Sequence, residues 1–381
     1  MEKYSQNRLA KGAFWTSMAF YGLIAFEFFY MFSPFAVYFY AVYGPGLDIL
    51  SLSGSTSWLI AFFMPHIARE TSSFFISWHE AIGMILFVAG LLAFMVGAIK
   101  IYLSKLKKQG AVVRGVYRYI RHPQYLALMI SSVGMVLIWP RYLVLIGCIT
   151  VCFAYVLLAR IEEKLCLRDF EGYDVYMSKT GMFLPKSIER FLSIISVPSS
   201  RAGKGLGIAA LYLILLATFL GGARVLQTYS VHSLYTLSTP QEVYLSIGKF
   251  ETNEFNELID IIYADKEVSE ILSRQKNPEN RWINYVMPTD LLISEVPMEI
   301  PEGRVPSHRS PHKEDPSRYK IIFTIADFGA SSPGNHLNIL KRAVNKTPVL
   351  EVWIDRVQQN VEKWILPTEE EVYFGMPVPV F

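Results

Sequence analysis

Two short apolar runs, about Gln124–Trp139 and Tyr142–Leu158, are separated only by Pro140-Arg141. Each run is near the lower limit of roughly 17 residues that an apolar helix needs to cross a bilayer. A link this short predicts that the two helices run antiparallel, as a tight hairpin. Because the two ends of a hairpin lie side by side, we expect Arg121-His122-Pro123, just before it, to meet Glu162-Glu163, just after it, at one membrane face.

Three further apolar runs predict membrane-spanning helices, at about Phe14–Tyr43, Ala81–Leu103 and Leu206–Leu226. The first is far longer than the roughly 7–15 apolar residues of a signal peptide, so we interpret it as a span and not as a cleaved signal. The piece Trp58–Met64 is too short to cross and predicts an interfacial or re-entrant segment. The chain is 52% hydrophobic. The prediction is a multi-span α-helical membrane protein with about five transmembrane helices.

Lysine and arginine are concentrated in the connecting segments that would lie on one side of the membrane. The N-terminus and the segments 100–121 and 160–204 are basic, whereas segment 44–79 carries only Arg69 and the hairpin tip only Arg141. By the positive-inside rule, the N-terminus and the hairpin ends are expected in the cytoplasm and everything after residue 230 outside. We therefore expect a multi-pass cell membrane protein with an extracytoplasmic C-terminal part.

Residues 230–381 differ in pattern from the rest, so we expect two domains, 1–229 in the membrane and 230–381 outside it. Short apolar runs and amphipathic runs alternate in the second part and predict a mixed α/β domain. The expected strands are Val243–Ile247, Lys320–Ile325 and Val349–Ile354, and the expected helices are Glu254–Arg274 and Asn335–Asn345.

Charge and cysteine content exclude some classes of function. The net charge is only +3, and the basic residues lie beside apolar runs, so a membrane surface is the expected partner and nucleic acid is not. Cys148 and Cys152 share a helix face, but no further ligand joins them, and we interpret them as core residues. His308 and His312 lie in a polar, proline-rich stretch and predict a solvated loop. No metal site is expected.

The residues at the hairpin ends could together hold a ligand of mixed chemistry. Arginine and histidine can donate hydrogen bonds to a carboxylate, and the two glutamates can accept from an amine or face a cation. Aromatic faces suited to an adenine or a sulfonium come from Tyr117, Tyr119, Tyr125, Tyr173 and Tyr176. By composition alone, an alternative is favoured: basic and tyrosine side chains often anchor helix ends at a membrane surface.

The order and spacing of these residues add a resemblance. Arg121-His122-Pro123-x-Tyr125, an apolar hairpin, Glu162-Glu163, then Phe170-x-x-Tyr173-x-x-Tyr176 and Pro185 resemble the isoprenylcysteine carboxyl methyltransferase and phospholipid methyltransferase superfamily, over about residues 80–190. The resemblance implies S-adenosylmethionine as cofactor, bound on the cytosolic side by Gly90, Arg121, His122, Pro123, Tyr125, Glu162 and Glu163. Ala127 stands where many relatives have glycine, and Phe170-Glu171-Gly172 displaces the usual Phe-Gly by one position.

The resemblance implies direct methyl transfer to a lipophilic acceptor that enters from the bilayer, such as an isoprenylcysteine carboxylate or a phospholipid amine. Arg118 or Arg160 could hold an acceptor carboxylate, and Glu162 could take the proton of an acceptor amine. A second hypothesis is a non-catalytic, methyltransferase-like subunit whose outer domain docks on a protein partner in a larger complex. A third, a membrane sterol-type reductase, is disfavoured by Pro123 and by the glutamate pair.

Overall fold

The computed structural model describes residues 46–106, 113–192, 201–293, 295–300, 317–329, 339–367 and 379–381, with Gly12, Trp15 and Met18. Apart from Trp15 and Met18, the predicted span Phe14–Tyr43 lies outside these residues, as do His308 and His312. The chain divides into two compact units. Unit 1 comprises Met1–Phe29, His79–Trp139 and Val144–Gly221, and unit 2 comprises Tyr30–Trp78, Pro140–Leu143 and Gly222–Phe381.

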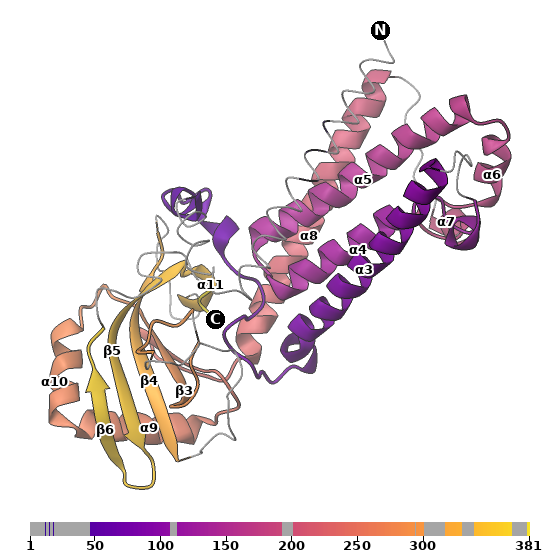
Figure 1. Cartoon of the computed structure of the whole chain (residues 1–381). Coiled ribbons are helices and arrows are strands. Elements are labelled where there is room, and N and C mark those ends of the chain that lie inside the picture. The colour runs from indigo at the N-terminus through magenta and orange to yellow at the C-terminus, as the bar shows by residue number, and fades with distance from the viewer. Residues whose placement is uncertain are drawn as a thin grey trace. The chain divides into compact units, whose positions relative to one another are not determined.

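Apolar helices dominate the described part of unit 1 (Figure 1). The helices are α3 (Phe74–Leu106), α4 (Pro123–Ile138), α5 (Tyr142–Asp169), α6 (Tyr173–Lys179), α7 (Lys186–Leu192) and α8 (Arg201–Ser233), with a 3-10 turn η2 (Gly115–Arg118); α3 and α8 extend into unit 2. Within the described residues, the segments Phe74–Ile101, Tyr142–Asp169 and Gly205–Ser233 are long and apolar enough to cross a membrane, and Pro123–Ile138 is a shorter apolar helix. The part of the chain that the structure describes thus contains three helices that could span a membrane, and the expectation of five stays a prediction.

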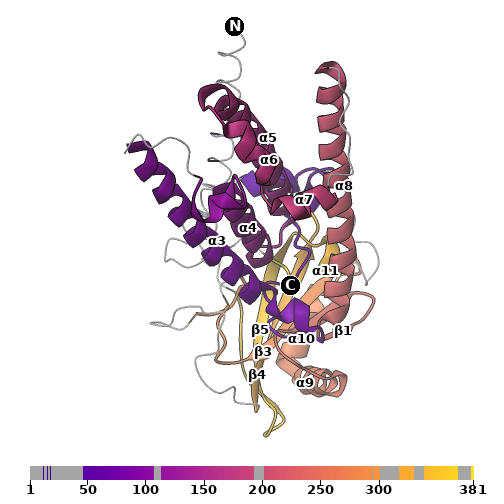
Figure 2. The same cartoon turned by 90° about the vertical axis from the view of Figure 1, so that its right-hand side faces the viewer.

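Glycines set how closely α3 approaches α4, which runs alongside it (Figure 2). A Cβ on Gly134 would lie 2.5 Å from the backbone nitrogen of Phe87, and one on Gly90 would lie 2.6 Å from the carbonyl oxygen of Ala127. Such distances exclude any side chain unless the helices move apart. The Ser131 hydroxyl donates to the carbonyl of Phe87 across the same contact, at 3.2 Å. This contact fixes the helix that carries the histidine-proline motif against α3.

Unit 2 is built on a six-stranded sheet of order β1-β2-β3-β4-β5-β6. The strands are β1 (Thr236–Ser238), β2 (Glu242–Ser246), β3 (Trp282–Pro288), β4 (Arg318–Asp327), β5 (Asn345–Asp355) and β6 (Asn360–Ile365). Strands β2 and β3 are parallel, and the other neighbours are antiparallel. The parallel pair is joined by helices α9 (Thr252–Ala264) and α10 (Lys266–Gln275), which lie against the sheet in Figure 1. An apolar core between these helices and the sheet includes Phe255, Leu258 and Val352.

The mixed sheet that the sequence predicted in this part of the chain is present, although three strands and some helix ends were not predicted. β2, β4 and β5 overlap the expected strands, with ends that differ by one to four residues, whereas β1, β3 and β6 were missed. The single helix expected over Glu254–Arg274 is broken at Asp265, whose carboxylate accepts from the Val268 N–H and so begins α10. Asn345 begins β5 and does not end a helix, and the described helix before it is α11 (Ile339–Arg342).

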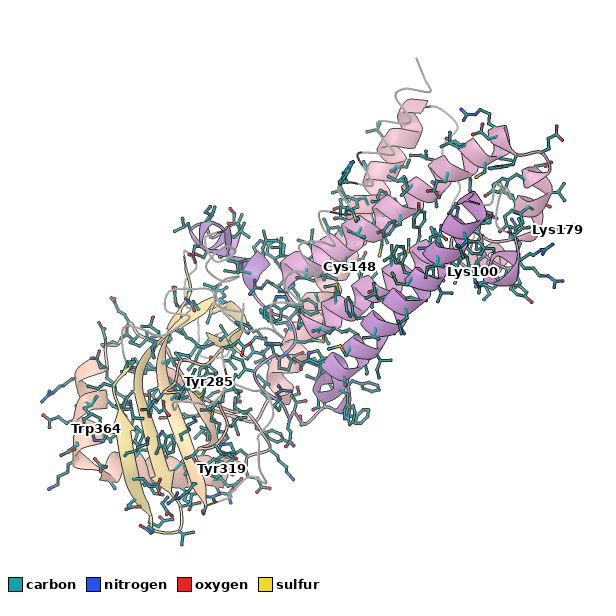
Figure 3. All side chains as sticks on the ribbon, viewed as in Figure 1. Lys100, Cys148, Lys179, Tyr285, Tyr319 and Trp364 are labelled. Carbon is teal, nitrogen blue, oxygen red and sulfur yellow. The ribbon has the colours of Figure 1, made fainter. Side chains whose placement is uncertain are left out.

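The opposite face of the sheet is also buried, and by irregular segments. The Tyr285 hydroxyl, on a residue labelled in Figure 3, donates to the carbonyl of Val380 at 2.7 Å. The Lys346 ammonium donates to the carbonyl of Pro379 at 2.5 Å. Residues 60–64 are buried in this unit too, where Gln227 donates to the Phe62 carbonyl at 2.7 Å. The piece predicted to be interfacial or re-entrant is therefore packed on protein, and other segments form hydrogen bonds with its backbone.

Candidate functional site

The motif loop leads into α4 with its backbone fixed on the segment that follows α6. Pro123 is at the first position of α4, where the missing N–H is not needed and the fixed φ favours a helix start. Just before it, Arg121 N–H donates to the Gly181 carbonyl at 2.8 Å, and His122 N–H donates to the Met182 carbonyl at 3.0 Å. A segment about 60 residues further along the chain thus holds the backbone of His122 in place.

Arg121 is the central cation of the site. Its Nε donates to Glu163 at 2.5 Å, and the two side chains are only 6% and 8% exposed. Its Nη1 donates to the carbonyl of Met177 at 3.2 Å and to the carbonyl of Thr180. These carbonyls lie at the C-terminal end of α6, where a positive charge is favourable. Arg121 therefore neutralises Glu163 and joins the start of α4 to both α5 and α6.

His122 lies between the two glutamates. Its Nδ1 is 3.5 Å from a carboxylate oxygen of Glu162, and its Nε2 is 3.4 Å from one of Glu163. The side chain of His122 is buried, and both distances are longer than those of strong hydrogen bonds. The imidazole thus lies near two carboxylates without a short hydrogen bond to either. Its ring nitrogens therefore remain able to bond to a ligand.

The two glutamates differ in environment. Glu162 accepts a hydrogen bond from the Tyr125 hydroxyl at 2.5 Å, and its side chain is 39% exposed, against 8% for Glu163. Among the described residues no arginine or lysine forms an ion pair with Glu162. Glu163 is therefore a buried, neutralised anion, and Glu162 is an accessible carboxylate held by an uncharged phenol. Glu162 is the one suited to meet a cation or a proton from outside.

The remaining aromatic residues of the prediction divide into two groups. Tyr176 donates its hydroxyl to the carbonyl of Tyr117 at 2.5 Å, and Tyr173 is buried beside it. Burial, and then the nearby Tyr176 and Glu162, raise the pKa of Tyr117 to about 12, so its phenol is neutral at physiological pH. Tyr119, in contrast, is 61% exposed. Tyr117, Tyr173 and the partly buried Tyr176 support the loop, and Tyr119 is available to solvent or lipid headgroups.

Three of the predicted site residues are not joined to this cluster. Arg118 and Arg160 are exposed, and within the described residues no hydrogen bond or ion pair connects either to His122 or to the glutamates. Arg160 precedes Glu162 by two positions on α5, so the two side chains point to different faces of the helix. Gly90 lies where α3 packs on α4. The catalytic role of the two arginines and the cofactor contact of Gly90 stay predictions.

Other residues that support the site were not predicted. The carboxylate of Glu189 accepts from the N–H groups of Met182, Phe183 and Leu184, at 2.5, 3.0 and 3.4 Å. It thereby shapes the segment that fixes His122. An acidic residue in the first turn of α7 is a signal for such capping in the sequence. A second unpredicted residue, Tyr155, stacks on Tyr125 with ring centroids 5.0 Å apart.

The segment that carries this polar cluster is similar to a known family of methyltransferases. Residues 78–171 match the phospholipid methyltransferase family. The matched segment contains both the histidine-proline motif and the glutamate pair, and it confirms the resemblance described above. No curated protein and no solved structure matched the chain.

Proposed function

We propose that the protein is an integral-membrane, S-adenosylmethionine-dependent methyltransferase that acts on a lipophilic acceptor, such as a phospholipid amine or an isoprenylcysteine carboxylate. The observation that carries the proposal is the convergence of His122, Glu162 and Glu163 from the two ends of the apolar hairpin. The match to the phospholipid methyltransferase family supports the same class of reaction. When bound, S-adenosylmethionine supplies a methyl group already activated on a sulfonium.

The residues present fit the cationic part of this cofactor. Glu162 offers an accessible carboxylate to an ammonium or sulfonium. The rings of His122 and Tyr125 are stacked, with centroids 5.5 Å apart and planes 6° from parallel, and both side chains contact Glu162, so an aromatic ring lies close to where a sulfonium would bind. Arg121 has already committed its Nε and Nη1 to Glu163 and to backbone carbonyls. The carboxylate of the cofactor therefore needs donors other than these two.

The chain's own contribution is to position the reactants and, for an amine acceptor, to take a proton. In-line transfer from a sulfonium depends on orientation and on exclusion of water more than on activation by the protein. Glu162 is the carboxylate able to accept a proton from an amine, because Glu163 is held by Arg121. By the positive-inside rule, the site faces the cytoplasm and the sheet of unit 2 lies outside the membrane, where a protein partner could bind.

Methyl transfer into lipid tests the proposal. The purified protein is reconstituted in vesicles containing phosphatidylethanolamine, or in vesicles containing a farnesylcysteine peptide, and supplied with methyl-labelled S-adenosylmethionine. We expect label in one of the two acceptors and a loss of about 100-fold or more in the Glu162→Gln variant. Glu171→Gln, which changes an exposed glutamate, is the matched control and should retain activity. A folded protein that transfers no label to either acceptor and binds no cofactor would instead support the non-catalytic subunit.

A further inference from the structure

We infer that Tyr155, on α5, is a positioning residue that orients Glu162 through the ring of Tyr125. The inference rests on the proposed function for its consequence, since it assigns Tyr155 a part in binding S-adenosylmethionine. Its structural basis is independent of that function and consists of ring stacking, burial and one hydrogen bond.

Three rings form a continuous stack from the motif loop toward the interior of the apolar hairpin. His122 and Tyr125 stack at 5.5 Å with an interplanar angle of 6°, and Tyr125 and Tyr155 stack at 5.0 Å with an angle of 17°. The ring of Tyr125 therefore has two near-parallel ring neighbours. Near-parallel aromatic pairs at such distances add attraction beyond the burial of their area.

Tyr155 and Glu162 share one face of α5. They are seven residues apart, about two turns or roughly 10 Å along the helix axis. Tyr125, from α4, connects the two positions: its ring rests on Tyr155, and its hydroxyl donates to Glu162. The angle at which the Tyr125 hydroxyl meets the carboxylate is thus set by the surface on which the ring lies.

The surroundings of Tyr155 make this surface rigid. Tyr155 is 6% exposed and packs in a cluster with Val151 and Leu158, against which Leu128 and Met129 also pack. A side chain fixed on all sides can hold the neighbouring ring in a single orientation. Leucine at position 155 would preserve apolar packing but remove the flat surface. The ring of Tyr125 would then adopt more orientations, and so would the carboxylate of Glu162.

The affinity for S-adenosylmethionine tests the role of Tyr155. We expect Tyr155→Leu to weaken S-adenosylmethionine binding by about fivefold, the scale of one lost aromatic pair. Tyr155→Phe keeps the ring and should bind within about twofold of the parent. The matched control is Tyr212→Leu, because Tyr212 also contacts α5 through its ring and hydroxyl, at Phe153 and Thr150. This control should leave the affinity unchanged. A Tyr155→Phe variant as impaired as Tyr155→Leu would overturn the inference.

A double-mutant cycle measured without cofactor tests the coupling between Tyr155 and Glu162 separately from the proposed function. The unfolding of the parent, Tyr155→Leu, Glu162→Gln and the double variant is measured in detergent micelles. We expect the two substitutions to be non-additive, because both disturb the same tyrosine. Additive effects would refute coupling between Tyr155 and Glu162, whatever the cofactor does. If the substitutions couple but the parent binds no S-adenosylmethionine, the positional link stands and the proposed function fails.

Discussion

Replacing Glu163 by alanine would leave Arg121 without its charged partner in a buried site. The guanidinium is only 6% exposed, and its Nε has Glu163 as acceptor at 2.5 Å. Removal of one member of a buried ion pair typically costs about 3–5 kcal/mol. Arg121 would retain the carbonyls of Met177 and Thr180, which places the expected loss of unfolding free energy near the lower limit, at about 3 kcal/mol.

Equilibrium unfolding in mixed micelles of a mild detergent and dodecyl sulfate, followed by circular dichroism, measures this loss. Glu171→Ala removes an exposed glutamate nearby and should change stability by less than about 0.5 kcal/mol. Arg121→Met combined with Glu163→Leu should recover most of the loss, because no buried charge is left unpaired. A Glu163→Ala variant within about 1 kcal/mol of the parent would show that the pair is not maintained, and the distinction between the two glutamates would then fail.

Two other substitutions test the structure, one in each unit: Gly134→Ala tests helix packing, and Lys346→Met tests the burial of a lysine. Gly134→Ala places a Cβ 2.5 Å from the Phe87 nitrogen and should destabilise unit 1 by roughly 1–3 kcal/mol, whereas Gly205→Ala, with nothing within 4 Å, should be neutral or stabilising in the same unfolding assay. In unit 2, burial lowers the pKa of Lys346 to about 7 from 10.5, against the opposing effect of Glu295. The native amine loses its proton at lower pH than the unfolded one, so stability should rise between about pH 7 and pH 10.5, by up to about 1.4 kcal/mol per unit. Unfolding curves of Lys346→Met should show a flatter pH dependence, and a parent slope equal to that of the variant would contradict this assignment.

The meeting of the hairpin ends was predictable, because a two-residue link between apolar runs leaves the helices little choice of direction. The position of the glutamates on a helix was not predicted. The chain after Leu158 has no helix breaker before Gly172, so α5 continues to Asp169 and carries both carboxylates inside its last turns. A charged continuation of an apolar run is easily taken for a loop when only hydropathy is considered.

The partners of the motif could not be predicted because they depend on contacts between distant segments. Arg121 is an obvious ligand for an anion in the sequence, yet the structure directs it to Glu163 and to carbonyls near Thr180. Nothing local to Tyr155 distinguishes it from other aromatic residues of an apolar helix. In unit 2, β3 was missed although its residues 282–288 are all buried, because a short apolar run without alternation has no clear period.

Calorimetric titration of the purified full chain with S-adenosylmethionine tests whether the protein binds this cofactor beside Glu162. We expect saturable binding to the parent at one site per chain, and a loss of about tenfold or more in affinity when Glu162 is replaced by glutamine, because the neutral amide no longer balances the cofactor's positive charge. The exposed-residue variant Glu171→Gln should bind as the parent does. Equal affinity of the Glu162→Gln variant and the parent would contradict the proposed cofactor site, as would an absence of binding in a folded sample.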